Sequence, residues 1–370
     1  MLNSLFWTFW LWVIALPFAG PIKSIYIASV VFILSFLRFI KFPATVSSFK
    51  DNWDEFIIKA NEKIPYGYLI VRILFILSLI VIPMFLDRRA NNILVDCGIY
   101  ALLALGLNIA VGFAGLLVLG YIAFYAIGAY TYALLSVHFH IPFFVCVPIS
   151  AGTAIIFGIL LGLPVLRLRG DYLAIVTLGF GEITRIVLNN WDNVTNGPNG
   201  ILGIARPSIG SFVFHSPKNY YYLILAFLFV AVFVFNRLNN SRLGRAWVAI
   251  KEDERAAKAM GINCMSLKLL AFAISAAFAG VAGAFFGAKA THVSPESFTF
   301  FESALVLCMV VLGGMGSIPG AILGASCLII IPEIFRDYFG NSRMLLFGIV
   351  MIAMMRFKPE GLLPYKRRNL

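Results

Sequence analysis

The chain has 370 residues, of which 61% are hydrophobic and only 12% are charged, and its formal net charge is +12. Soluble domains carry about 25% charged residues, so this composition excludes an ordinary soluble protein and predicts an all-α polytopic membrane protein in contact with lipid. Residues 97–166 contain no Asp, Glu, Lys or Arg. The basic residues follow the loops instead of forming a patch, so we expect no nucleic-acid partner.

The cysteines and histidines indicate no metal or disulfide site. The five cysteines have no close spacing, which is typical of small core residues: Cys97, Cys146, Cys264, Cys308 and Cys327. His138 and His140 form a His-x-His pair at the end of an apolar segment, without carboxylate or thiol partners. We therefore expect no metal and no cofactor in this chain.

Residues 1–65 are predicted to be an N-terminal extension. Two apolar segments, 2–16 and 25–39, predict two spanning helices, and a polar cytoplasmic linker follows them. A cleaved signal peptide is disfavoured, because no basic region precedes the first segment and Lys23 follows it.

Residues 66–370 are predicted to form the membrane core, with about ten helices. The apolar spans are 66–85, 93–111, 121–135, 142–166, 172–188, 220–235, 267–288, 298–312, 318–331 and 344–355. Several are shorter than the ~20 residues of a straight span, which predicts broken or re-entrant segments. The expected breaks are two glycine-rich stretches. One contains Gly112 and Gly115, and the other contains Gly313 and Gly316. Lipid permits such irregular backbone only where protein or a cavity satisfies it.

Glycines at a spacing of four mark places where two helices can approach closely. Gly316, Gly320 and Gly324 form such a ridge on one predicted helix face. We expect this ridge to contact another helix.

A polar segment, residues 236–266, separates two long apolar spans and must be a loop. Ser241 is a helix-start signal and Gly261 a helix stop, so one short helix is predicted between them. An apolar stripe lies on one side of it: Ala246, Ala249, Ile250, Ala256, Ala257 and Met260. Asp253 is the one charge within the stripe. Small residues favour docking in a groove on another protein; the alternative, a helix resting on the bilayer, would favour Leu and Phe.

The orientation follows from the basic residues. With the loop at 236–266 inside, the inner connections and tail carry 19 Lys and Arg and the outer connections carry eight. By the positive-inside rule, both termini are expected to be cytoplasmic.

Several stretches resemble known transporter sequences. Residues 242–261 resemble the cytoplasmic coupling loop of ABC importer permeases, and Ala256-Ala257-x-x-x-Gly261 matches part of their ATPase-docking motif. The usual Glu before the alanines is Arg255 here, with Glu254 one place earlier.

The remaining motifs resemble the LivM-type permeases of the branched-chain amino acid ABC transporter family. They are Arg-Gly-Asp-Tyr-Leu-Ala-Ile-Val-Thr-Leu-Gly-Phe-Gly-Glu-Ile at 169–183, Asn-Gly-Pro-Asn-Gly-Ile at 196–201, Val-Ser-Pro-Glu-Ser-Phe-Thr-Phe-Phe-Glu-Ser at 293–303, Val-Val-Leu-Gly-Gly-Met-Gly-Ser-Ile-Pro-Gly at 310–320 and Phe-Lys-Pro-Glu-Gly-Leu-Leu-Pro at 357–364. The match covers residues 90–364 in register. The first 65 residues carry no matching motif.

This resemblance implies an importer of branched-chain amino acids in the bacterial inner membrane. A periplasmic binding protein would deliver the substrate, this chain and a second, different permease would form the pathway, and two cytoplasmic ATPases would bind ATP and Mg. It also implies a coupling loop between the sixth and seventh core helices. The expected ATPase-docking residues are Ala246, Ala249, Ile250, Glu254, Arg255, Ala256, Ala257, Met260 and Gly261.

The chain itself is expected to be a transporter subunit and not an enzyme. It contains no Gly-x-x-x-x-Gly-Lys-Ser/Thr motif, so it is not the ATPase. Two alternatives stay open. The same type of importer could carry another amino acid or urea. A stand-alone secondary transporter would instead need ionisable coupling residues at mid-membrane and no docking loop.

Glu182 is the candidate residue of the pathway. It lies about ten residues into its span, or ~15 Å, close to the middle of a ~30 Å hydrocarbon core. Arg185 lies three residues later on the same face, so the two can pair. One interpretation is an ion pair that joins helices. The other is that Glu182, with Thr177 and Thr184, lines the route of a zwitterionic amino acid.

Overall fold

The computed structural model describes residues 79–334, apart from 82, 167, 169, 210 and 211, together with 348, 352, 356 and 361–363. Nearly all of them belong to one unit, Phe85–Arg336 with Leu346–Leu370, and this unit alone is considered below. The predicted spans 2–16 and 25–39, and most of 66–85 and 344–355, lie outside the described residues. So does the predicted domain boundary after residue 65, which stays a prediction.

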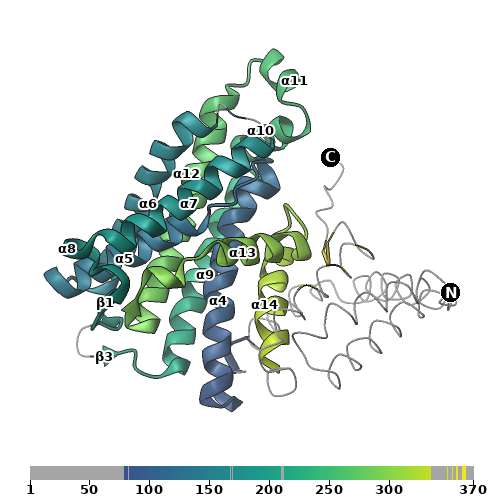
Figure 1. Ribbon diagram of the computed structural model, residues 1–370. Coiled ribbons are helices and arrows are strands. Elements are labelled where there is room, and N and C mark those ends of the chain that lie inside the picture. The colour runs from purple at the N-terminus through teal and green to yellow at the C-terminus, as the bar shows by residue number, and fades with distance from the viewer. Residues whose placement is uncertain are drawn as a thin grey trace, which may run out of the picture. The chain divides into compact units, whose positions relative to one another are not determined.

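The described part of the chain is built almost entirely from helices (Figure 1). The α-helices are α4 (Arg88–Asn108), α5 (Ile122–Phe139), α6 (Phe143–Val165), α7 (Asp171–Asn190), α8 (Asp192–Thr195), α9 (Pro217–Asn239), α10 (Arg242–Glu252), α11 (Glu254–Ala259), α12 (Cys264–Ala290), α13 (Phe300–Gly313) and α14 (Ile318–Ile334). A π-helix, η1 (Ile109–Phe113), continues α4, and two 3-10 turns are η2 (Gly197–Asn199) and η3 (Pro295–Ser297).

Short strands occur in the connections on one side of the helices. β1 (Ile201–Leu202) pairs antiparallel with β4 (His292–Val293), and β2 (Ser208–Ile209) pairs with β3 (Phe212–Val213). α9 and α12 run from this side to α10 and α11, which lie at the opposite end (Figure 1).

Six helical stretches among the described residues are long and apolar enough to cross a membrane. They are Arg88–Phe113, Ile122–Phe139, Phe143–Val165, Pro217–Asn239, Cys264–Ala290 and Pro295–Gly313, and a shorter apolar helix covers Ile318–Glu333. Each span predicted between residues 93 and 331 coincides with a helix. The predicted all-α polytopic fold is therefore confirmed.

The core is organised around α12, which packs against α4, α5 and α6. Its packing face consists largely of Ala and Gly, which let helix backbones approach closely. A Cβ added to Gly128 of α5 would lie 2.5 Å from the Cα of Gly280 in α12, so there is no room for a side chain. Towards the other end of α12, Phe285 makes edge-to-face contacts with Phe143 and Phe227, with ring centroids 5.0 and 4.9 Å away.

Two breaks interrupt the helices, both in the predicted glycine-rich stretches. After η1 the chain leaves the helix at Gly115, whose φ is +68°, and it becomes helical again at α5. Between α13 and α14, Gly314 and Gly316 have φ values of 113° and 88°. Such positive φ values favour glycine, because a Cβ would clash there. Gly112 is still inside η1, so the first break begins slightly later than predicted.

The second break is held by the tail of the chain. The N–H groups of Leu362 and Leu363 donate to the carbonyl oxygens of Leu312 and Gly313, at 2.8 and 3.0 Å. These are the last carbonyls of α13, which have no partner within the helix.

Candidate functional site

The loop between α9 and α12 is anchored firmly on the membrane helices. Ser241 caps α10, as predicted, because its hydroxyl oxygen accepts the N–H of Gly244. Trp247 is fully buried, and its indole Nε1 donates to the carbonyl oxygen of Leu267 in α12, at 2.8 Å. The position of α10 relative to α12 is therefore well defined.

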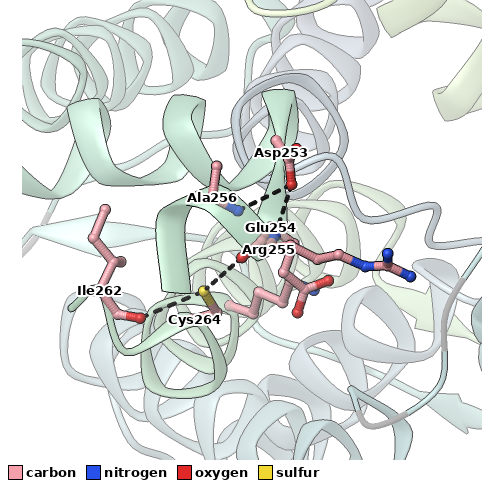
Figure 2. Close-up of polar contacts among 7 residues, drawn as sticks. Asp253, Glu254, Arg255, Ala256, Ile262 and Cys264 are labelled. Carbon is pink, nitrogen blue, oxygen red and sulfur yellow. Dashed lines mark hydrogen bonds and ion pairs between the residues drawn. The ribbon is translucent and has the colours of Figure 1, made fainter. Parts of the chain in front are cut away.

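The loop contains two helices and not the single helix that was predicted. Asp253 separates α10 from α11 in an extended conformation, with φ −152° and ψ 107°. Its carboxylate accepts the N–H groups of Arg255 and Ala256, at 2.8 and 3.1 Å (Figure 2). Asp is a strong N-cap, and this local bond competes with a continuous helix. The charge that seemed misplaced within an apolar stripe is the start signal of the second helix.

The turn at Asp253 also divides the predicted docking stripe. Ile250 and Ala257 are each only 4% exposed and form an apolar cluster with Cys264 at the start of α12. Ala249 packs against this cluster, and Ala246 is half-buried. We therefore correct the prediction for Ile250 and Ala257: their side chains face this chain and are not available to a partner.

The rest of the predicted docking set is accessible. Met260 is 82% exposed, and Arg255, Ala256 and Gly261 are exposed too. Gly261 ends the segment with φ +82°, in agreement with the predicted helix stop. An exposed methionine on a short, internally anchored helix is a typical contact residue, because its flexible apolar side chain adapts to a partner.

A basic cavity of about 370 Å³ lies beside α11. Its charged lining is Arg255, Lys258, Lys268 and Glu254, and Lys268 pairs with Glu254 at 2.9 Å. The Sγ of Cys264 lies 3.7 Å from the carbonyl oxygen of Glu254, next to this cavity (Figure 2). The surplus of basic groups suits an acidic side chain from a partner.

The predicted pathway residues lie on α7, at the edge of the bundle. Arg185 donates through Nε to Oε2 of Glu182 at 2.9 Å, and both side chains are about one-third exposed. The pair that the spacing predicted is therefore present, within one helix. Whether it joins helices or lines the substrate route stays a prediction.

The two threonines have structural partners. Thr177 is fully buried, and its Oγ1 donates to the carbonyl oxygen of Ala174 and accepts the N–H of Leu119, at 3.1 Å. It thus holds the segment that follows the first break. Thr184 is bonded to the carbonyl oxygen of Phe180, one turn earlier in the same helix.

The sequence analysis missed a polar stripe on α4. It joins three other helices through the pairs Arg89–Glu333 (3.0 Å), Asp96–Lys289 (2.5 Å) and Tyr100–Glu302 (2.7 Å). A cavity of about 510 Å³, lined by Arg89, Asn92, Ile93, Asp96, Ile329 and Glu333, opens at this end of α4, away from α10. The signal was present in the sequence, because spacings of seven and four place Arg89, Asp96 and Tyr100 on one face of a helix.

Comparison with known proteins gives a consistent picture. The family described as "Branched-chain amino acid transport system / permease component" matches residues 89–355. The chain is 45% identical to the high-affinity branched-chain amino acid transport system permease protein LivM of Escherichia coli K12, over 92% of this chain and 85% of that protein. It is 47% identical to LivM of Salmonella typhimurium, over 80% and 76% of the two chains.

More distant relatives include a second kind of permease. The chain is 30% identical to the branched-chain amino acid permease protein LivH of Escherichia coli K12, over 48% of this chain and 60% of LivH. No solved structure gives a significant match.

Proposed function

The chain belongs to the branched-chain amino acid transport permease family, and from this premise we propose that it is the transmembrane permease subunit of an ATP-driven importer for branched-chain, hydrophobic amino acids. The observation that carries the proposal is similarity along nearly the whole chain to permeases named for this transport. Its role in the importer is to form the pathway, and ATP hydrolysis belongs to partner subunits, which bind ATP and Mg.

We assign α10 and α11 as the coupling loop that meets a cytoplasmic ATPase. The accessible contact residues are Arg255, Ala256, Met260 and Gly261, and the neighbouring basic cavity would receive an acidic side chain. The buried anchors Trp247 and Ile250 hold the loop on α12, so that a force applied to α11 moves the membrane helices with it.

The proposed assembly contains this chain, a second and different permease, two ATPases and a periplasmic binding protein. A second permease is supported by the similarity of this chain to both LivM and LivH, which are different permeases in one organism. With the coupling loop in the cytoplasm, both termini are cytoplasmic and the membrane is the bacterial inner membrane. The asymmetry of basic residues supports this orientation.

For the pathway, we propose Glu182 and Arg185 as groups accessible to a zwitterionic substrate. Their pair is within one helix and about one-third exposed, so either charge can turn to a ligand without separating two helices. Thr177 is not part of this proposal, since it is buried against Leu119.

Uptake by the reconstituted complex tests the function. The chain would be purified with its candidate ATPases and second permease, placed in proteoliposomes and supplied with binding protein and labelled leucine. We expect ATP-dependent uptake that isoleucine and valine suppress and that urea and lysine do not. Uptake that persists without the ATPases would establish a secondary transporter instead, and suppression by urea would reassign the substrate.

A further inference from the structure

Lys251, in the last turn of α10, reaches from the coupling loop to the first helix break. Its Nζ donates to the carbonyl oxygen of Gly112 in η1, at 2.8 Å. A Cβ added to Gly115 would lie 3.0 Å from Cγ of Lys251, so the lysine stem runs directly along the break. Gly112 lies at the C-terminal end of a helix, where carbonyls have no partner within the helix and a cation is favoured.

Asn108 lies one turn before Gly112 and connects the first break to the second. It is fully buried, and its Oδ1 accepts the N–H of Gly316, at 2.7 Å, while its Nδ2 donates to the carbonyl oxygen of Ser317, at 3.1 Å. The acceptor oxygen and the donor nitrogen of the amide are thus both bonded to residues of the second break. A fully satisfied buried polar group of this kind fixes its neighbours in one arrangement.

The two breaks also touch through their backbones. A Cβ added to Gly112 would lie 2.5 Å from the backbone nitrogen of Gly316, so η1 and the second break cannot slide past each other without separating. The loop, the first break and the second break are therefore linked by three hydrogen bonds made by only two side chains.

We infer that Lys251 and Asn108 are positioning residues that couple movement of the ATPase-docking loop to both helix breaks. This inference rests on the proposed function, because it takes α11 as the contact with the ATPase. Packed, hydrogen-bonded elements of this kind carry coupling between distant sites. Lys251 joins the loop to the first break by a side-chain hydrogen bond.

The test compares Lys251→Met, which keeps the stem and removes the amine, with Arg245→Met as the matched control. Arg245 is an exposed basic residue on the same helix, α10, and its guanidinium donates to the carbonyl oxygen of Asn240, just before that helix. The measurements are co-purification of the ATPases, ATP hydrolysis, and leucine taken up per ATP hydrolysed. A hydrogen bond to a charged group is worth about a factor of ten or more in an equilibrium.

For Lys251→Met we expect normal co-purification and ATP hydrolysis, with about a tenfold lower uptake per ATP hydrolysed. Lys251→Arg, which keeps a donor, should recover most of it, and Arg245→Met should match the unmodified protein. An unchanged ratio in Lys251→Met would overturn the inference. So would loss of the assembled complex, because the bond would then only stabilise the fold. Failure of the unmodified complex to import leucine would instead count against the proposed function.

A double-mutant cycle provides a second measurement. Asn108→Ser keeps one polar group at the buried site, and it would be combined with Lys251→Met. If Lys251 and Asn108 act in one connection, each substitution lowers uptake per ATP hydrolysed much less when the other is already present than it does alone. Multiplicative effects of the two substitutions would show independent roles and would contradict the inference.

Discussion

Helices α4 and α7 both carry charged or polar groups, but they use them differently. On α4, Arg89, Asp96 and Tyr100 bond to three other helices. On α7, Glu182 and Arg185 bond to each other, and their side chains have no bond to another helix among the residues that the structure describes. The difference indicates that α4 is part of the fixed frame, whereas the charges of α7 are dispensable for holding helices together.

The surroundings of the two helices agree with this difference. From Val95 to Asn108 nearly every α4 side chain is buried, while α7 exposes Ile175, Ile183 and Ile186 by 63%, 60% and 52%. An apolar exposed face suits lipid or another apolar surface, and the charges beside it are about one-third exposed. Three sets of substitutions test the comparison.

The largest difference should appear at glycines. In α4, a Cβ on Gly106 would lie 2.5 Å from Cβ of Phe278, whereas nothing lies within 4 Å of a Cβ on Gly179 in α7. We expect Gly106→Leu to abolish the folded protein, since overpacking of a tight contact costs roughly 1–3 kcal/mol or more. Gly179→Leu should give a normal yield. The yield of monodisperse protein in size-exclusion chromatography measures both, and equal yields would contradict the assignment of α4 to the frame.

An intermediate effect is expected for the pair between α4 and α12. Lys289→Met removes the partner of Asp96 and should lower Tm by about 2–4 °C, which corresponds to ~1 kcal/mol for a partly exposed pair. The exchange Asp96→Lys with Lys289→Asp should recover part of this loss. The Tm values are measured by thermal unfolding in detergent. Arg185→Met, which removes a cation from α7, is the matched comparison. A larger loss of Tm in Arg185→Met would reverse the comparison.

The smallest effect on stability is expected on α7. A pair at a spacing of three contributes only about 0.2–0.5 kcal/mol, so Glu182→Arg, Arg185→Glu and their combination should all assemble normally. We expect the exchanged protein to lose uptake nevertheless, because the carboxylate and the guanidinium would meet the substrate in reversed positions. Uptake at the unmodified rate in the exchanged protein would remove Glu182 from the pathway.

Local signals in the sequence predicted much of the fold and part of the candidate site. The cap at Ser241, the stop at Gly261 and both helix breaks depend on a few neighbouring residues, and each break lies within the predicted glycine-rich stretch, although it begins slightly later than predicted. The pairing of Glu182 with Arg185 followed from their spacing in the same way.

Errors arose where a residue has two competing roles or where its partner is distant. Asp253 was taken as a charge on a helix face, but its carboxylate is short enough to bond backbone N–H groups and start a new helix. The connections of Asn108 and Lys251 could not be predicted, because no local pattern indicates which distant backbone group a side chain will reach.

The bonds from Leu362 and Leu363 to the end of α13 have a consequence for biosynthesis. A chain is made from its N-terminus, so α13 and α14 emerge before the residues that cap the carbonyls of Leu312 and Gly313. During that interval the second break lacks these two partners in a membrane that offers few others. The final arrangement of this break, and hence of the residues that Asn108 holds, is therefore reached only after residues 362 and 363 have been synthesised.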